Sequence, residues 1–382
     1  MSFAVLALIC LVALLGPLLA SRQAWHLPVV LGELLAGLVL GRSGLEIIDA
    51  SDQTFGFLAQ IGFAMVMFVA GSHVPMRDDR IRPALRGGLA RVGLIVLTAV
   101  GLGLGFANIF SDEHWMLYAV IMASSSAAVV LPMLDSLRLG GPKVIELLPV
   151  IAIVDVLCIV TLPLALDPSA ALRALIGVLA VLGGGLVAYL LLAKIEATGL
   201  RRRIHTISEE RLFAVELRVS LVILFALSAL AVLLGVSVML AGFVLGLAVA
   251  RVGEPRRVAN QVFAITEGLF APVFFVWLGS SLDLGDLAAH PMMILLGVAL
   301  AAGSLLAHLT PMSLGQPLSL SVLSAAQMGV PIAATTIGTQ MGVLSPGEGS
   351  ALILSVLLTL AAAMAGGAAA SSRRVDKLVS EG

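Results

Sequence analysis

The chain has 382 residues, of which 60% are hydrophobic and only 12% are charged, whereas about 25% of the residues in soluble domains are charged. This composition excludes an ordinary soluble enzyme. The formal net charge of −1 leaves no surplus of basic residues to neutralise phosphates, so no nucleic acid is expected as a partner. The sequence therefore predicts an integral membrane protein in contact with membrane lipid.

The predicted fold class is an all-α membrane protein with about 13 transmembrane helices, because a helix needs about 20 apolar residues to cross the hydrocarbon core. Charged residues and Gly/Pro breaks separate the apolar segments. The predicted spans cover residues 3–21, 28–45, 55–75, 85–109, 115–137, 143–166, 170–194, 213–235, 237–251, 262–282, 290–309, 316–341 and 347–370.

The distribution of the 22 Lys and Arg residues predicts the orientation, since cytoplasmic loops retain positive charge. With the N-terminus outside and the C-terminus in the cytoplasm, all of them except Arg42 and Arg173 fall on the cytoplasmic side. A missed or surplus helix would reverse this asymmetry part-way along the chain, and no reversal occurs. We expect a multi-pass protein of the cell (plasma or inner) membrane.

Two motifs recur in the same order in the two halves of the chain. LAGLVLG at 35–41 matches LAGFVLG at 240–246, and FAMVMFVAGS at 63–72 resembles FAPVFFVWLGS at 270–280. The offset of about 205 residues relates spans 1–6 to spans 8–13 and leaves one odd connecting span. The second half is therefore inverted in the membrane, and inverted repeats are typical of secondary transporters.

Polar, breakable stretches occupy corresponding positions in the fifth and twelfth spans. MASSSAAVVLPML contains Ser124, Ser125, Ser126 and Pro132, and AAQMGVPIAATTIG contains Pro331 among other polar or helix-breaking residues. Interrupted helices in corresponding positions indicate a substrate site, and exposed carbonyl and hydroxyl oxygens suit a dehydrated monovalent cation. The alternative is that the hydroxyls only bond their own helix or join helices.

Asp155 lies at the middle of the sixth predicted span, in PVIAIVDVLCIV, and no Lys or Arg of that span accompanies it. A charge at this depth is costly, so an ionisable residue there is a functional candidate. A carboxylate that takes up either a proton or a cation provides the minimal chemistry of an antiporter. The alternative is a protonated Asp that forms a hydrogen bond in a helix interface.

The other membrane carboxylates lie nearer to helix ends or motifs. Glu33 precedes Gly37 of the repeated motif by one turn, which favours packing or capping, and Glu146 lies near the cytoplasmic end of its span. For Glu216 and Glu267, ion pairs at a gate or an interface are expected.

The sequence resembles the monovalent cation:proton antiporter-2 family, which includes bacterial sodium/proton antiporters and glutathione-gated potassium efflux systems. The residues that carry the resemblance extend over the whole chain. They are LPVVLGELLAGLVLG at 27–41, GFAMVMFVAGS at 62–72, SSSAAVV at 124–130, VD at 154–155, VSVMLAGFVLGL at 236–247 and FAPVFFVWLGSSLDL at 270–284.

This resemblance implies a homodimer whose dimerisation and core domains move relative to each other in an elevator-type transport cycle. The implied divisions are 1–75 and 213–282 for dimerisation, 170–194 for a linker helix, 85–166 and 290–370 for the core, and 371–382 for a cytoplasmic tail. The interrupted helices would cross in the core.

The resemblance also implies the roles of the site residues. Asp155 is the implied ion- and proton-binding carboxylate, and Ser125 and Ser126 are the implied hydroxyl ligands. The further expected neighbours of this site are Ser124, Ser304, Gln327 and Thr335.

Two departures from the family pattern bear on the number of charges carried. Electrogenic members carry two adjacent acids where this chain has Val154 and Asp155, and Ser304 replaces a family lysine. A single carboxylate without a companion lysine favours electroneutral, one-for-one exchange. His308 is an alternative titratable group, although a helix end at the cytoplasmic interface is the expected position for it.

The sequence thus predicts a secondary antiporter that exchanges Na⁺ or K⁺ for protons, not an enzyme, and it predicts no cofactor. The alternatives are a channel or uniporter for a cation or small solute, or a cation sensor, on the same fold. An intramembrane aspartyl protease needs two facing carboxylates, and only Asp155 is placed convincingly at mid-depth.

Overall fold

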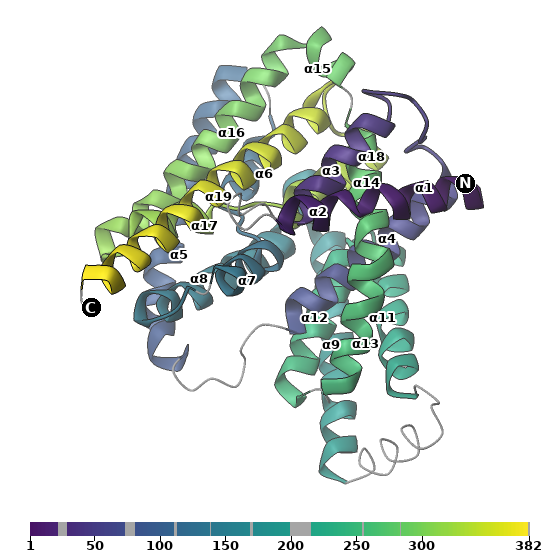
Figure 1. Cartoon of the computed structure of the whole chain (residues 1–382), viewed down its shortest axis with the longest axis horizontal. Coiled ribbons are helices and arrows are strands. Elements are labelled where there is room, and N and C mark those ends of the chain that lie inside the picture. Colours follow the sequence, from purple (N-terminus) through teal and green to yellow (C-terminus); the bar gives the residue numbers. More distant parts are fainter. Residues whose placement is uncertain are drawn as a thin grey trace.

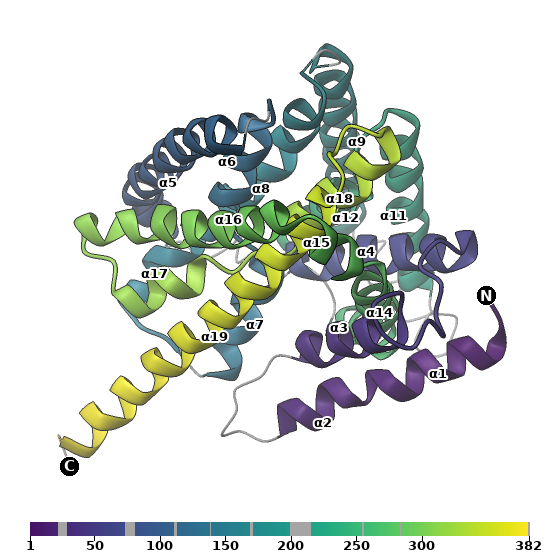
Figure 2. The same cartoon turned by 90° about the horizontal axis from the view of Figure 1, so that it is seen from above.

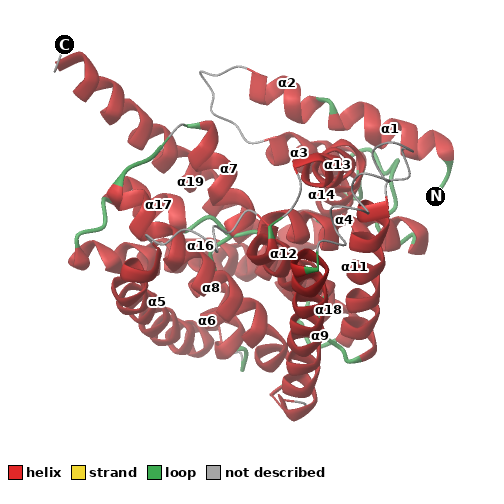
Figure 3. Ribbon diagram, turned by 90° about the horizontal axis from the view of Figure 1, so that it is seen from below, coloured by secondary structure: helices red, strands yellow, loops and turns green. Residues whose placement is uncertain are grey.

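A computed structural model describes residues 1–21, 29–72, 81–110, 113–137, 139–168, 171–198, 215–253, 256–282 and 284–380. All regular structure in these ranges is helical (Figure 3). The helices form two groups that lie side by side in Figures 1 and 2, and the mutual packing of their helices defines each group. An all-α membrane architecture is therefore confirmed, while the predicted number of spans and their inverted repeat stay predictions.

The first group, which we call the glycine-packed group, contains the two copies of the repeated motif. Its members are α1 (Phe3–Ala13), α2 (Leu15–Ser21), α3 (Val29–Leu40), α4 (Gln53–Ser72), α9 (Ala171–Ala197), α11 (Val215–Leu233), α12 (Val238–Val252), α13 (Arg256–Ile265), the π-helical turn η3 (Thr266–Phe270) and α14 (Ala271–Ser281).

The second group, which we call the site group, contains the polar stretches and Asp155. Its members are α5 (Ile81–Phe110), α6 (Trp115–Ala123), α7 (Ala127–Ser136), α8 (Pro142–Leu166), α15 (Leu284–Ala289), α16 (Pro291–Leu309), the 3₁₀ turn η4 (Thr310–Leu314), α17 (Leu318–Ser324), α18 (Gly329–Met341) and α19 (Glu348–Ser380).

Within the described ranges, nine helical segments are long and apolar enough to cross a membrane. They are Gln53–Ser72, Gly87–Phe110, Pro142–Leu166, Leu175–Ala197, Val215–Leu233, Asn260–Ser281, Pro291–Leu314, Leu318–Met341 and Glu348–Ser371. Large apolar side chains such as Leu97, Leu186 and Val222 point outward, as expected of helices whose outer surface contacts lipid.

The C-terminal segment differs from the sequence prediction. Helix α19 continues to Ser380, so residues 371–380, expected as a tail after the last span, extend this helix.

Some basic residues used for the orientation lie outside the described residues. These are Arg22, Arg77, Arg80, Arg138, Arg201, Arg202, Arg203 and Arg211.

Close backbone contacts at glycines join the two halves of the chain in the glycine-packed group. A Cβ atom on Gly37 of α3 would meet the carbonyl oxygen of Val276 in α14, and one on Gly242 of α12 would meet that of Ala64 in α4. Each LAG helix therefore packs against the phenylalanine-rich helix of the other half. Small residues permit this close approach in membranes, where dispersion contacts drive helix packing.

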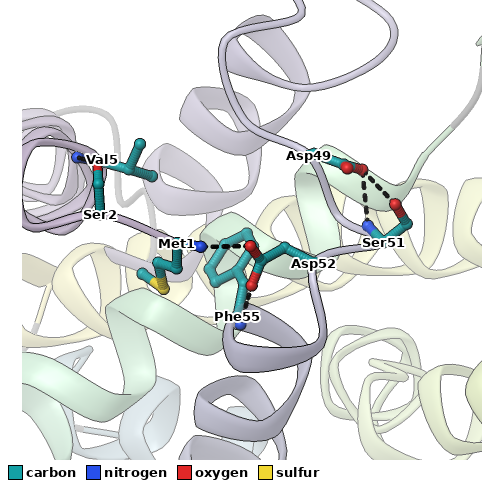
Figure 4. Close-up of polar contacts among 7 residues, drawn as sticks. All are labelled: Met1, Ser2, Val5, Asp49, Ser51, Asp52 and Phe55. Atoms are coloured by element: carbon teal, nitrogen blue, oxygen red, sulfur yellow. Dashed lines mark hydrogen bonds and ion pairs between the residues drawn. The ribbon is translucent and has the colours of Figure 1, made fainter.

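The connection between α3 and α4 is held by short polar contacts (Figure 4). Asp52 caps α4 by accepting a hydrogen bond from the Phe55 N–H at 2.9 Å, and it pairs with the Met1 ammonium group. Asp49 accepts hydrogen bonds from the hydroxyl and the N–H of Ser51 at 2.7 and 2.9 Å. These hydrogen bonds lower the pKa values of both carboxyl groups, so both stay ionised at neutral pH.

Gly242→Ala tests the backbone contact. The added methyl group would meet the Ala64 carbonyl oxygen, so we expect a loss of about 2 kcal/mol of unfolding free energy, a typical cost of overpacking. Gly101→Ala on α5 is the matched control, because no atom lies within 4 Å of its Cβ position. Denaturant titration in detergent checks both variants, and equal stability of the two would contradict the proposed role of the contact.

Candidate functional site

Two helices of the site group are interrupted. Helix α6 ends at Ala123 and α7 begins at Ala127, so residues 124–126 form a first gap. Helix α17 ends at Ser324 and α18 begins at Gly329, so residues 325–328 form a second gap. The three serines of the fifth predicted span lie in the first gap.

The prolines do not mark the gaps. Pro132 lies inside α7, and Pro331 is the third residue of α18. Proline is tolerated in the first turn of a helix because the N–H groups there have no intrahelical acceptor. The second gap therefore begins at Ala325, six residues before Pro331.

The two gaps satisfy each other's backbone groups. The Ser125 hydroxyl donates to the Ser324 carbonyl oxygen at 2.6 Å, and the Ser126 N–H donates to the Ala326 carbonyl oxygen at 2.8 Å. In return, the Gln327 side-chain amide donates to the Ile121 carbonyl oxygen at 2.5 Å. Each gap therefore donates a hydrogen bond to a carbonyl oxygen in the last turn of the helix that precedes the other gap, where carbonyl groups commonly lack intrahelical donors.

Asp155 of α8 lies against the first gap. Its side chain is only 3% exposed, and Oδ2 accepts a hydrogen bond from the Ala127 N–H at 3.0 Å. Ala127 is the first residue of α7, so the carboxylate lies at a helix N-terminus, where free N–H groups and the helix dipole favour negative charge. Among the described residues, no basic side chain forms an ion pair with it.

The expected neighbours separate into two sets. Ser304 of α16 accepts a hydrogen bond from Gln327 at 2.8 Å, and the Ser124 hydroxyl donates to the Ile121 carbonyl oxygen at 2.8 Å. Both therefore contact the gap region. Thr335 instead donates to the carbonyl oxygens of Pro331 and Gly349, at 3.0 and 3.4 Å, and joins α18 to the start of α19.

His308 lies in the last turn of α16, as expected of a helix-end residue, but its side chain is completely buried. Its Nε2 lies 3.1 Å from the Ala123 carbonyl oxygen, and its Nδ1 lies 3.2 Å from the Ser324 hydroxyl. Helical spacing gave one indication, since His308 lies one turn after Ser304 on the same face of α16.

The other acidic residues occupy different places. Glu146 at the start of α8 pairs with Arg91 at 2.6 Å and with Lys143 at 3.2 Å. Glu33 is buried in α3, whereas Glu267 is exposed on the π-helical turn. The hydrogen bonds of the Glu146 side chain within the described residues go to Arg91 and Lys143, not to the gaps.

A cavity of about 240 Å³ lies between the two helix groups. Its walls come from α4, the turn between α11 and α12, α14 and α18, and its polar groups include Gln60, Ser237, Trp277, Thr336 and Gln340. Asp155, Ser125 and Ser126 are not among the residues that line it. The cavity therefore marks incomplete packing between the groups, next to the helix that follows the second gap.

Residues 10–365 match the sequence model of the family described as sodium/hydrogen exchanger, transmembrane. This match covers most of the chain. The chain belongs to the sodium/hydrogen exchanger family. It is thus a multi-pass membrane protein of a transporter family, and the resemblance to the monovalent cation:proton antiporters is confirmed.

Three curated relatives illustrate the range of this exchanger family. A putative Na⁺/H⁺ antiporter, YjbQ, of Bacillus subtilis is 23% identical over 94% of this chain and 61% of its own length. An Na⁺/H⁺ antiporter of Enterococcus hirae is 26% identical over 76% of each chain. The glutathione-regulated potassium-efflux system protein KefC of Salmonella arizonae is 27% identical over 70% of this chain and 43% of its own.

This exchanger-family chain thus spans less than two thirds of the length of the Bacillus and Salmonella relatives. A solved structure, that of the sodium proton antiporter MjNhaP1 of Methanocaldococcus jannaschii at pH 8, superposes with a TM-score of 0.68 and 20% identity. The superposition covers 96% of this chain and 95% of that one. At this identity the likeness establishes the fold.

Ser125→Ala tests the contact between the gaps. Loss of the hydroxyl leaves the buried Ser324 carbonyl oxygen without this donor, and we expect a loss of about 1–3 kcal/mol of unfolding free energy. Ser355→Ala is the matched control, because this equally buried hydroxyl bonds only to the Leu352 carbonyl oxygen of its own helix, at 2.7 Å. Equal losses in denaturant titrations would contradict a role for the contact between the gaps.

Proposed function

We propose that the chain exchanges a monovalent cation, Na⁺ or K⁺, for protons across the membrane, with Asp155 binding the proton and the cation in competition. One observation carries the proposal: a buried carboxylate lies at the start of α7, beside a gap rich in hydroxyl and carbonyl oxygens. Oxygen ligands of this kind suit a hard cation that has lost its water.

The competition follows from the cost of burying charge. An ionised carboxylate in an apolar interior needs a compensating positive charge, and the described surroundings of Asp155 provide one backbone N–H and no basic side chain. A proton and a bound cation are then the two ways to neutralise it. Ser125 and Ser126 are the proposed hydroxyl ligands beside it, with no second acid at Val154.

The exchange is proposed to be electroneutral. The repeat offset of 205 residues places Leu360 of α19, an apolar side chain that is 2% exposed, at the position in the second half that corresponds to Asp155. With one carboxylate, Asp155, beside the pair of gaps, one proton leaves for each cation that binds.

Alternating access is proposed to come from an elevator-type movement of the site group against the glycine-packed group within a homodimer. The cavity between the groups and the separate packing of each group support this view. We place the N-terminus outside and the C-terminus in the cytoplasm, on the charge pattern. The relatives named for Na⁺/H⁺ antiport and for potassium efflux support monovalent cations as a class.

Asp155→Asn is the central test. The amide oxygen can still accept the Ala127 N–H, but the side chain can no longer exchange a proton for a cation. In vesicles with an imposed pH gradient, we expect Na⁺, Li⁺ or K⁺ to evoke proton movement with the unmodified protein and none with the variant. Glu267→Gln, which removes an exposed carboxylate of the glycine-packed group, should retain at least half of the rate. Full activity of Asp155→Asn would overturn the proposal.

Electroneutrality has a separate test. The initial rate of cation-evoked proton movement should stay within about 20% when the membrane potential is clamped at zero with valinomycin and equal K⁺ on both sides, because one charge moves in each direction. A severalfold change in rate on clamping would show that net charge crosses the membrane in each cycle.

A further inference from the structure

His308 joins the ends of two helices that approach each other from different halves of the chain. Ala123, whose carbonyl oxygen lies 3.1 Å from Nε2, is the last residue of α6. Ser324, whose hydroxyl lies 3.2 Å from Nδ1, is the last residue of α17. The imidazole belongs to a third helix, α16, and has no exposed surface.

The hydrogen-bond partners determine where the imidazole proton lies. A carbonyl oxygen can only accept, so Nε2 carries the hydrogen that reaches Ala123. The Ser324 hydroxyl has a single hydrogen, which can go either to the Ser321 carbonyl oxygen, 2.8 Å away, or to Nδ1 of His308. Both nitrogens of the neutral imidazole are satisfied when the hydroxyl turns to Nδ1, and the bond from Nε2 to Ala123 persists whichever way the hydroxyl turns.

The same three-residue gap is held at its other end by Asp155. The Ala123 carbonyl group precedes residues 124–126 and binds His308, whereas the Ala127 N–H follows them and binds Asp155. Gln327 holds α6 two residues earlier, at the Ile121 carbonyl oxygen. His308 is thus the side chain that fixes the last peptide group before Ser124.

We propose that His308 is a positioning residue for the ion site. By anchoring Ala123 it fixes the start of the gap, and so the placement of the Ser125 and Ser126 oxygens relative to Asp155. This inference rests on the proposed function. His308 itself does not touch the cation, and its loss lowers cation affinity more than it lowers the maximal rate.

Three substitutions separate the two hydrogen bonds of His308. His308→Gln retains an amide N–H near the position of Nε2 and should keep the bond to Ala123, whereas His308→Asn retains a polar group near Nδ1 and loses that bond. His308→Ala loses both. We expect the Asn and Ala variants to raise the KM for the cation about tenfold or more, the usual effect of losing a residue that orients a ligand.

In the same vesicle assay, the kcat of the Asn and Ala variants should stay within about twofold of that of the unmodified protein. This change in kcat is much smaller than the change in KM expected from losing an orienting residue. His308→Gln should restore KM to near its original value. His290→Gln is the matched control, because it changes an exposed histidine at the other end of α16 and should leave KM unchanged. Ser324→Ala should also have little effect, since the bond from Nε2 to Ala123 remains.

An unchanged KM in His308→Ala, or a KM in His308→Gln as high as in His308→Ala, would overturn the positioning role. Hydrogen–deuterium exchange provides a readout that needs no transport. Peptides covering residues 121–127 should exchange faster in His308→Ala than in His308→Gln, and equal exchange would overturn the proposal. Absence of cation-evoked proton movement in the unmodified protein would refute the proposed function, while the exchange measurement would still test the anchor.

Discussion

Backbone hydrogen bonding imposes the strictest demand on this molecule, because a helix interrupted inside a membrane has no water to satisfy its free carbonyl and N–H groups. Residues 124–126 and 325–328 meet this demand by pairing with each other, through the Ser125 hydroxyl, the Ser126 N–H and the Gln327 amide. Each such group left unpaired would cost about 1–3 kcal/mol. The two gaps are therefore stable only as a pair, and the surrounding helices of the site group keep them together.

The pairing leaves a different group at each end of the first gap. The Ala123 carbonyl oxygen at one end is held by His308, and the Ala127 N–H at the other is held by Asp155. Under the proposed function, a proton or a cation at Asp155 would change the charge at the end that carries the free N–H groups of α7, where a carboxylate is most stable. One short backbone segment would then connect the carboxylate with the geometry of the gap.

The glycine-packed group is held together by close backbone contacts between its helices. At Gly37 and Gly242 the helix backbones come so close that a Cβ atom would meet a carbonyl oxygen of the neighbouring helix. Such contacts resist displacement, whereas the boundary with the site group includes a cavity of about 240 Å³. The proposed movement of the two groups rests on this contrast between a tightly packed group and a boundary that includes a cavity.

The sequence alone determined the membrane class and the family, and it singled out Asp155 and the serines as candidate site residues. Hydropathy, charge asymmetry and repeated motifs are local or periodic properties, and a buried acid is conspicuous where only 12% of residues are charged. The sequence did not determine where the second helix breaks, because Pro331 is compatible with a first helical turn, nor that His308 is buried. These points depend on contacts between residues 123 and 308 or 125 and 324, and only the tertiary structure brings such distant groups within hydrogen-bonding distance.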